Sequence, residues 1–290
     1  MARFTILAGL LAMLIAGRAF AAAPRVVASI KPIHALVAGV MDGVGVPALL
    51  VEGSASPHSY ALRPTAAKTL SEADVVFWIG PELETTLEKP LVSLSAKAHV
   101  IGLLRADGVK ALRGVSAETV DGHIWLDVEN ARAMVTAIAE TLSKADASHA
   151  QSYARNAADV KAKLAALDEN LRVILAPAQS RPFIVFHDAY RYFTNRYGLN
   201  MLASVTINPD QPPGARHVAE LKAIIARNTS ICVFVEPQFQ PKLMSIFHES
   251  ANARVGVLDP EGSALPPGSA LYTDLMQGIA DNLVRCLSVP

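Results

Sequence analysis

The amino-acid sequence predicts an α/β protein of two lobes, each a mainly parallel β-sheet flanked by helices, joined by a long rigid helix. Short apolar runs rich in β-branched residues alternate with amphipathic stretches near both ends of the 290-residue chain. Such alternation is typical of βαβ units, which form parallel sheets covered by helices. Between these two regions, residues 128–176 contain no strand-like run and no glycine. We therefore expect an N-terminal lobe over 22–145, a linking helix over 146–178 and a C-terminal lobe over 179–290.

The N-terminal lobe is expected to contain four strands, of which the last is the weakest. Helices should run from Pro32 to Met41, from Thr65, and from Pro81. Pro81 is well placed to begin its helix, because proline is well suited to the first helical position. The expected strands are Val26–Ile30, Pro47–Val51, Asp74–Gly80 and His99–Leu103.

The middle of the chain is rich in Ala, Leu, Lys, Glu and Arg, with apolar residues at helical spacing. This pattern predicts one helix over Asn130–Ser143 and a second from about Ser148 to Leu175, ending before Pro177. The second helix would span roughly 40 Å at 1.5 Å per residue. That length suits a stiff strut between two lobes, although an ordinary long packing helix would have the same pattern.

The C-terminal lobe repeats the alternation of strands and helices. Helices are expected from Ala189, from Ala215, from Pro241, and from about Ser269 to Leu287. The expected strands are Phe183–His187, Met201–Ile207, Ser230–Glu236 and Ala253–Asp259.

The N-terminus indicates export. Arg3 is followed by an apolar run from Phe4 to Ala16 and by small residues that end at Ala21. This is the layout of a signal peptide over residues 1–21. The apolar run is shorter than the ~20 residues that a membrane span needs, although an uncleaved anchor remains an alternative. The cleavage region has no cysteine, which argues against a lipid anchor, so we expect a soluble periplasmic protein.

Charge and cysteine content narrow the function further. Lys+Arg and Asp+Glu both number 26, so no basic excess points to nucleic acid. The two cysteines, Cys232 and Cys286, form an even number in an oxidising compartment, which favours a disulfide over two buried free thiols. On the chain-entropy account, such a bridge would stabilise the fold by about 4 kcal/mol.

Polar side chains at strand ends are the candidate ligand-binding residues, because ligands of open α/β sheets bind beyond the carboxyl ends of the strands. His58 follows the second expected strand, and His123 lies in the loop after the fourth. His187 and Asp259 each end a strand of the C-terminal lobe. Taken singly, these are a surface histidine, a core histidine or a helix-capping aspartate. Taken together, three imidazoles and one carboxylate suit tetrahedral Zn²⁺.

Three more residues are candidates for supporting roles. Glu236 ends the strand that contains Cys232, and it is the alternative carboxylate, although a hydrogen bond behind the ligands or a structural role is the simpler interpretation. Asp188 and Trp125 lie beside two of the histidines and could orient or shield a ligand. The sequence has no P-loop and no local zinc-protease motif.

Around these residues the sequence strongly resembles the zinc-binding periplasmic substrate-binding proteins of ABC transporters (the ZnuA type of the metal-binding cluster A-I family). The resemblance spans nearly the whole chain after residue 21. It implies a metal ion in the cleft between the lobes, held by His58, His123 and His187, with Asp259 or water as the fourth ligand. It also implies a Cys232–Cys286 disulfide. The segments that carry it are SPHSYALRPT, HIWLD, FHDAYRYF, CVFVEPQF and LDPEGS.

The sequence departs from that family in two places. Many relatives have a histidine- and acid-rich insert before the second ligand, but residues 103–122 contain no histidine. Any metal-scavenging function of such an insert should be absent here or shared with another protein. Some relatives have an acidic residue where this chain has Pro57. Its absence here removes one candidate for the fourth metal ligand and therefore favours Asp259. Related manganese binders have a carboxylate where this chain has His187, which favours zinc.

The resemblance implies capture of Zn²⁺ as a transported ligand and its delivery to the membrane permease of an ABC zinc transporter, by a monomer that is not an enzyme. Three alternatives remain: manganese or iron transport, an exported adhesin, and a zinc hydrolase. Because only neutral imidazoles bind metal, we expect zinc affinity to fall steeply below about pH 6, near the ordinary histidine pKa.

Overall fold

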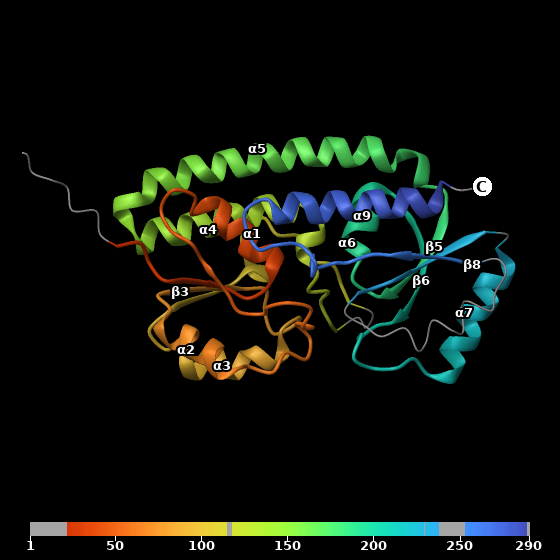
Figure 1. The fold of residues 1–290 in the computed structure, drawn as a ribbon, viewed down its shortest axis with the longest axis horizontal. Coiled ribbons are helices and arrows are strands. Elements are labelled where there is room, and N and C mark those ends of the chain that lie inside the picture. Colours follow the sequence, from red (N-terminus) through yellow and green to blue (C-terminus); the bar gives the residue numbers. More distant parts are fainter. Residues whose placement is uncertain (1–21, 115–117, 229, 238–252, 289–290) are drawn as a thin grey trace, which may run out of the picture.

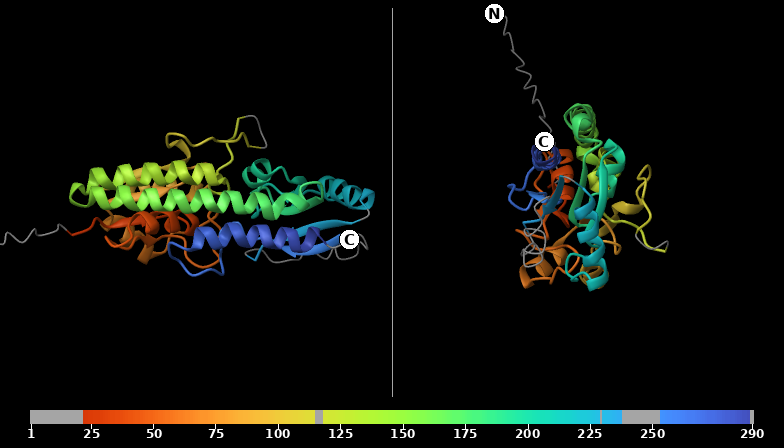
Figure 2. Two further views of the ribbon diagram at one scale, coloured as in Figure 1. Left: turned by 90° about the horizontal axis from the view of Figure 1, so that it is seen from above. Right: turned by 90° about the vertical axis from the view of Figure 1, so that its right-hand side faces the viewer.

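A computed structural model describes residues 22–114, 118–228, 230–237 and 253–288 (Figure 1). The two lobes lie side by side, and three helices run along the long axis: α4 (Val128–Ala145), α5 (Ala150–Leu175) and α9 (Leu271–Leu287) (Figures 1 and 2). The predicted fold class is confirmed: each lobe has a four-stranded sheet, and every strand pair is parallel. Among the described helices, none has the length and apolar character needed to cross a membrane.

The first sheet has the strand order β2-β1-β3-β4. Its central strands, β1 and β3, are entirely buried, as expected for apolar runs covered by helices on both faces. The strands are β1 (Val26–Ala28), β2 (Ala48–Leu49), β3 (Val75–Trp78) and β4 (His99–Gly102). The helices are α1 (Lys31–Val40), α2 (Pro64–Glu72) and α3 (Glu88–Leu94).

The prediction of a helix that begins at Pro81 is wrong. The chain turns after Gly80, forms a 3₁₀ turn over Thr85–Leu87 and enters α3 only at Glu88. The cause is the buried side chain of Glu84, which accepts hydrogen bonds from the main-chain N–H groups of Ile79 and Gly80 at 2.8 and 3.1 Å. These bonds hold the segment after β3 as a loop.

The second sheet has the order β6-β5-β7-β8. Helix α6 begins at Arg191, two residues later than expected, because the chain turns after His187. The helix expected from Pro241 lies outside the described residues. The strands are β5 (Pro182–His187), β6 (Asn200–Thr206), β7 (Ile231–Val235) and β8 (Ala253–Val257). The described helices of this lobe are α6 (Arg191–Tyr197), α7 (Ala215–Arg227) and α9 (Leu271–Leu287).

Two long helices pack against each other, and the second of them joins the lobes. Helix α4 (Val128–Ala145) packs against α5 (Ala150–Leu175), which is 26 residues long and is flanked by 3₁₀ turns. At 1.5 Å per residue α5 is about 39 Å long, and it contacts both α1 of the first lobe and α9 (Figure 1). The helix therefore supports both lobes along one side.

The predicted disulfide between Cys232 and Cys286 is confirmed. It joins β7, in the middle of the second sheet, to the end of α9. Cys232 is fully buried. The bridge holds the last helix against the second lobe.

Candidate metal centre

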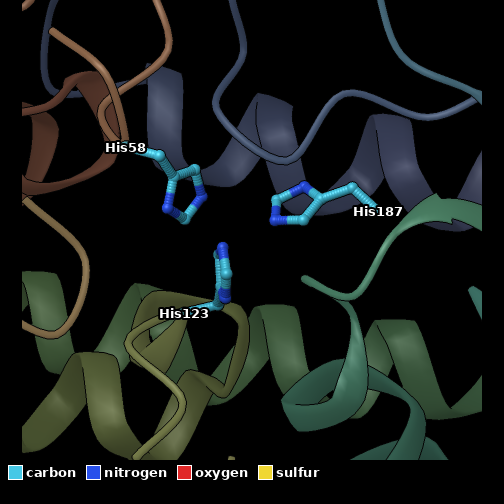
Figure 3. A group of neighbouring side chains, drawn as sticks. All are labelled: His58, His123 and His187. Atoms are coloured by element: carbon cyan, nitrogen blue, oxygen red, sulfur yellow. The ribbon is translucent and has the colours of Figure 1, made fainter. Parts of the chain in front are cut away.

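Three imidazoles from distant parts of the chain meet where the lobes adjoin (Figure 3). His58, His123 and His187 each offer a ring nitrogen, and these nitrogens all lie within 4.8 Å of one another. The Nε2 atoms of the three rings are buried, and none has a hydrogen-bond partner among the described residues. A buried polar atom normally has a partner, so three unpartnered nitrogens in one place indicate a missing electron-pair acceptor.

Each histidine is placed by a different element. His187 is the last residue of β5, beside the end of β6, and is 3% exposed. His123 comes just before a 3₁₀ turn at Ile124–Leu126 that leads into α4. His58 lies in the loop that follows β2, and it is partly exposed. Two ligands from the first lobe therefore face one from the second.

Carboxylates lie behind two of the rings. Asp121 accepts hydrogen bonds through Oδ1 from the main-chain N–H of His123 at 3.0 Å and from its Nδ1 at 2.8 Å. The carboxylate of Glu236 lies 3.4 Å from Nδ1 of His187. A proton held on Nδ1 leaves the lone pair on Nε2, directed into the site. This arrangement is usual for metal-ligating histidines.

Burial keeps two of the imidazoles neutral. It lowers the pKa of His58 to about 2, and the neighbouring His123 and His187 lower it further. Burial also lowers the pKa of His187 to about 4, against an opposing effect of Asp121 and Asp210. The pKa of Glu236 is raised well above its ordinary value, first by burial and then by the charge of Asp259. Neutral imidazoles can bind a metal ion without first losing a proton.

Asp259 does not belong to the group of mutually close ligand atoms. Its Oδ1 accepts hydrogen bonds from the main-chain N–H groups of Glu261 and Gly262, both at 3.0 Å. Its Oδ2 accepts from the N–H and the hydroxyl of Ser263, at 2.6 and 2.7 Å. Its carboxylate thus organises the turn after β8. The structure brings together three of the four predicted ligands.

The turn that contains Asp259 is held by the first lobe. Nε1 of the fully buried Trp125 donates to the carbonyl of Pro260 at 2.7 Å. Nζ of Lys31, at the start of α1, donates to the carbonyls of Gly262, Ser263 and Leu265 at 3.2, 2.6 and 3.0 Å. The ring of Trp125 also lies 5.3 Å from that of His123. Trp125 therefore supports both the second histidine and the Asp259 turn.

A cavity of about 250 Å³ adjoins two of the three imidazoles. His58 and His123 line it, together with Asp188, Arg191 and Asp121. The main-chain N–H of Asp188 donates to the carbonyl of Thr206 at 3.1 Å, which fixes this residue just beyond β5. Burial raises the pKa of the Asp188 carboxyl to about 6, opposed in part by Arg191. The cavity is thus a polar cleft beside the site.

Sequence reasoning missed Asp121 and Lys31. The signal for Asp121 was available, because an aspartate two residues before a candidate ligand can reach its ring nitrogen, as in Asp121-Gly122-His123. Lys31 gave no such signal. Its partners lie more than 230 positions along the chain, and only the fold brings them near.

Known proteins are similar to this chain in sequence. The profile of the family described as "Zinc-uptake complex component A periplasmic" matches residues 26–286. A high-affinity zinc uptake system protein ZnuA from Brucella suis is 37% identical over 305 residues, covering 91% of this chain and 91% of the relative. The protein of the same name from Paracoccus denitrificans is 36% identical, with 91% and 92% covered.

Solved structures agree with the fold. A crystal structure of ZnuA has a TM-score of 0.78 at 29% identity, covering 90% of this chain and 99% of that one. The periplasmic zinc binding protein TroA from Treponema pallidum has a TM-score of 0.79 at 22% identity, covering 91% and 99%. At that identity the second comparison supports the fold alone.

Proposed function

The chain belongs to the family of periplasmic zinc-uptake components, and on this premise we propose that it captures Zn²⁺ in the periplasm and delivers it to an ABC-type membrane permease. The observation that supports this most directly is the convergence of three buried, unpartnered Nε2 atoms from two lobes. Imidazole nitrogens are ligands that zinc favours. The ion is the cargo of the protein rather than a cofactor for a reaction.

We assign the Nε2 atoms of His58, His123 and His187 as three of the zinc ligands. Zinc–nitrogen bonds of 2.0–2.1 Å require tetrahedral ligand atoms about 3.3 Å apart. The nitrogens lie within 4.8 Å of one another, so the rings need to approach by at most about 1.5 Å. Asp259 or a water molecule would complete the shell. Asp259 can do so only if its turn, already tied by four hydrogen bonds, shifts toward the histidines.

The same ligand set bears on the choice of metal and on the hydrolase alternative. Manganese favours oxygen donors, and the three close ligand atoms here are all nitrogens, which favours zinc over manganese transport. A zinc hydrolase also uses three protein ligands and an open position. The family is one of uptake components rather than enzymes, so we favour a carrier, which binds and releases the ion unchanged.

Location and partners follow the family. The predicted signal peptide, residues 1–21, lies outside the described residues. We propose that it is cleaved, that the exported protein acts as a soluble periplasmic monomer, and that its partner is the permease of a zinc transporter. No part of this proposal requires a lipid anchor or nucleic acid.

Elemental analysis tests the proposal. The exported chain is purified without added metal, and the bound elements are counted per chain. We expect one zinc per chain, with loss of that zinc in a triple variant in which His58, His123 and His187 become alanine. Manganese or iron in place of zinc, or equal zinc in both proteins, would contradict the proposal.

A further inference from the structure

The polar cleft adjoins the metal centre at two of its three histidines. Both His58 and His123 line this cavity of about 250 Å³. His123 is 7% exposed, and its Nε2 is buried without a partner among the described residues. An ion that reaches this nitrogen from the cleft must give up water molecules before the imidazoles can replace them. The residues lining the cleft therefore influence how fast the ion enters.

The three histidines cannot attract the ion by charge. An imidazole binds a metal ion only in its neutral form, so the ligand set has no net negative charge. A hydrated divalent cation that approaches a buried site loses favourable hydration before it gains the new bonds. An anionic oxygen at the boundary between cleft and site would lower this barrier, because it attracts the ion and can replace its first water molecule.

Three acidic residues line the cleft, and two are already engaged. The carboxylate of Glu82 accepts a hydrogen bond from Arg105 at 2.6 Å. Asp121 holds the ring of His123 through its Oδ1, and its Oδ2, which has no hydrogen-bond partner among the described residues, is buried away from solvent. Among the described residues, no hydrogen bond or ion pair involves the side chain of Asp188, the third of the group.

The cation in the same cleft does not neutralise that carboxylate by direct contact. Arg191 lies three residues after Asp188, and its Nη1 donates a hydrogen bond to the carbonyl of Arg113 at 2.7 Å. Its charge weakens the local negative field, but Asp188 is partly exposed and lines the cleft. Asp188 is also outside the group of mutually close ligand atoms. It therefore lies near the site without belonging to the final set of ligands.

We propose that Asp188 is the first protein ligand of the incoming zinc ion, and that it passes the ion to the three Nε2 atoms. This inference rests on the proposed function. In the first step a carboxylate oxygen replaces one water of the hydrated ion. In the second step the imidazoles replace further waters and the Asp188 oxygen, and the released waters return to the cleft. Because Asp188 stabilises the intermediate and not the end state, it speeds both binding and release.

Stopped-flow mixing of the metal-free protein with Zn²⁺ tests this role. Trp125 is a built-in reporter, since its ring lies 5.3 Å from that of His123. We expect Asp188→Asn to lower the association rate constant about tenfold and the dissociation rate constant by a similar factor. The equilibrium dissociation constant, measured by competition with a chelator, should change less than about threefold. Added salt should slow the unaltered protein more than the variant.

Asp159→Asn is the matched control, because it removes the same charge from an exposed position on α5. An association rate constant for Asp188→Asn equal to that of this control would overturn the proposal. So would a loss of affinity that arises only from faster dissociation, since that would make Asp188 a resident ligand. Failure of the unaltered protein to bind zinc would instead reject the proposed function. Far-UV circular dichroism confirms that each variant is folded.

Discussion

The guanidinium of Arg196 binds the carboxylate of Asp168 through two hydrogen bonds of 2.6 Å, from Nε to Oδ1 and from Nη2 to Oδ2. Arg196 lies on α6 of the second lobe and Asp168 on the linking helix α5. Nη1 of the same arginine donates to Asp127, the residue that caps α4, at 3.0 Å. One side chain therefore fixes the second lobe to both long helices, close to the junction where the histidines meet.

Replacing Arg196 with methionine should destabilise the metal-free protein. The two side chains of the pair are only 11% and 8% exposed, so the change leaves the charge of Asp168 largely buried. Breaking a buried pair costs about 3–5 kcal/mol. We expect the lower end of that range, because Arg172 and Tyr197 still donate to Asp168. Urea unfolding followed by circular dichroism measures the change in free energy.

The control for this variant is Arg216→Met. Arg216 pairs with Glu220 on α7, but its side chain is 94% exposed. An exposed pair contributes little to stability, so the unfolding midpoint should barely move. Equal destabilisation by the two variants would refute the role given to Arg196.

His187→Ala should weaken zinc binding by at least about 100-fold. Removing a residue that hydrogen-bonds to a metal ligand lowers metal affinity about 10–100-fold, and removing the ligand itself should lower it more. Isothermal titration of the metal-free protein with zinc measures the effect. His99→Ala is the control, since His99 is exposed on β4. Unchanged affinity in the His187 variant would remove this residue from the metal centre.

Asp121→Ala should weaken zinc binding about 10–100-fold, since the ring of His123 loses the carboxylate that orients it. Asp121→Asn keeps an oxygen acceptor, so it should recover part of the affinity. Asp107→Ala removes an exposed acid from the same lobe and should have no effect. If the alanine and asparagine variants bind zinc equally well, loss of the hydrogen bond to the His123 ring does not explain the weaker binding.

At His58 and His187 the structure moves proton competition with zinc to lower pH than the sequence alone predicts. The pKa values of His58 and His187 are lowered to about 2 and about 4, so both imidazoles stay neutral at pH 5. Protons then compete with zinc at these two residues only below about pH 5, rather than below pH 6. Titrations at pH 7, 6, 5 and 4 would locate the loss. A steep loss between pH 7 and 6 would show that proton uptake at these two residues does not govern the pH dependence.

The same pKa shifts affect the stability of the metal-free protein. In the unfolded chain these histidines take up protons below about pH 6.5, whereas in the folded protein they resist protonation until much lower pH. The unfolded state then binds more protons, so stability should fall as pH decreases from 6.5 toward 4. Urea unfolding at pH 7 and pH 5 measures this fall. The fall in the free energy of unfolding between pH 7 and pH 5 should be smaller in the double variant His58→Ala, His187→Ala.

Much of the fold could be predicted from sequence, because buried parallel strands and amphipathic helices have distinct apolar spacings. The strand that ends at His187 and the long helix ending at Leu175 are examples. The segment after Pro81 could not be predicted, since the side chain of Glu84 rather than local propensity determines its path.

The candidate site was predictable in part. Strand-end position and family resemblance identified all three converging histidines. Neither could show whether the carboxylate of Asp259 points at the metal or at its own turn, because both uses suit an aspartate after a strand. That question depends on distances of a few ångströms, which sequence spacing does not determine.

The packing of α9 against α1 has a consequence for folding. These helices lie more than 230 residues apart in the sequence, yet they pack against each other. Contacts between such distant segments form slowly, so the first lobe completes its packing only when α9 docks, late in folding.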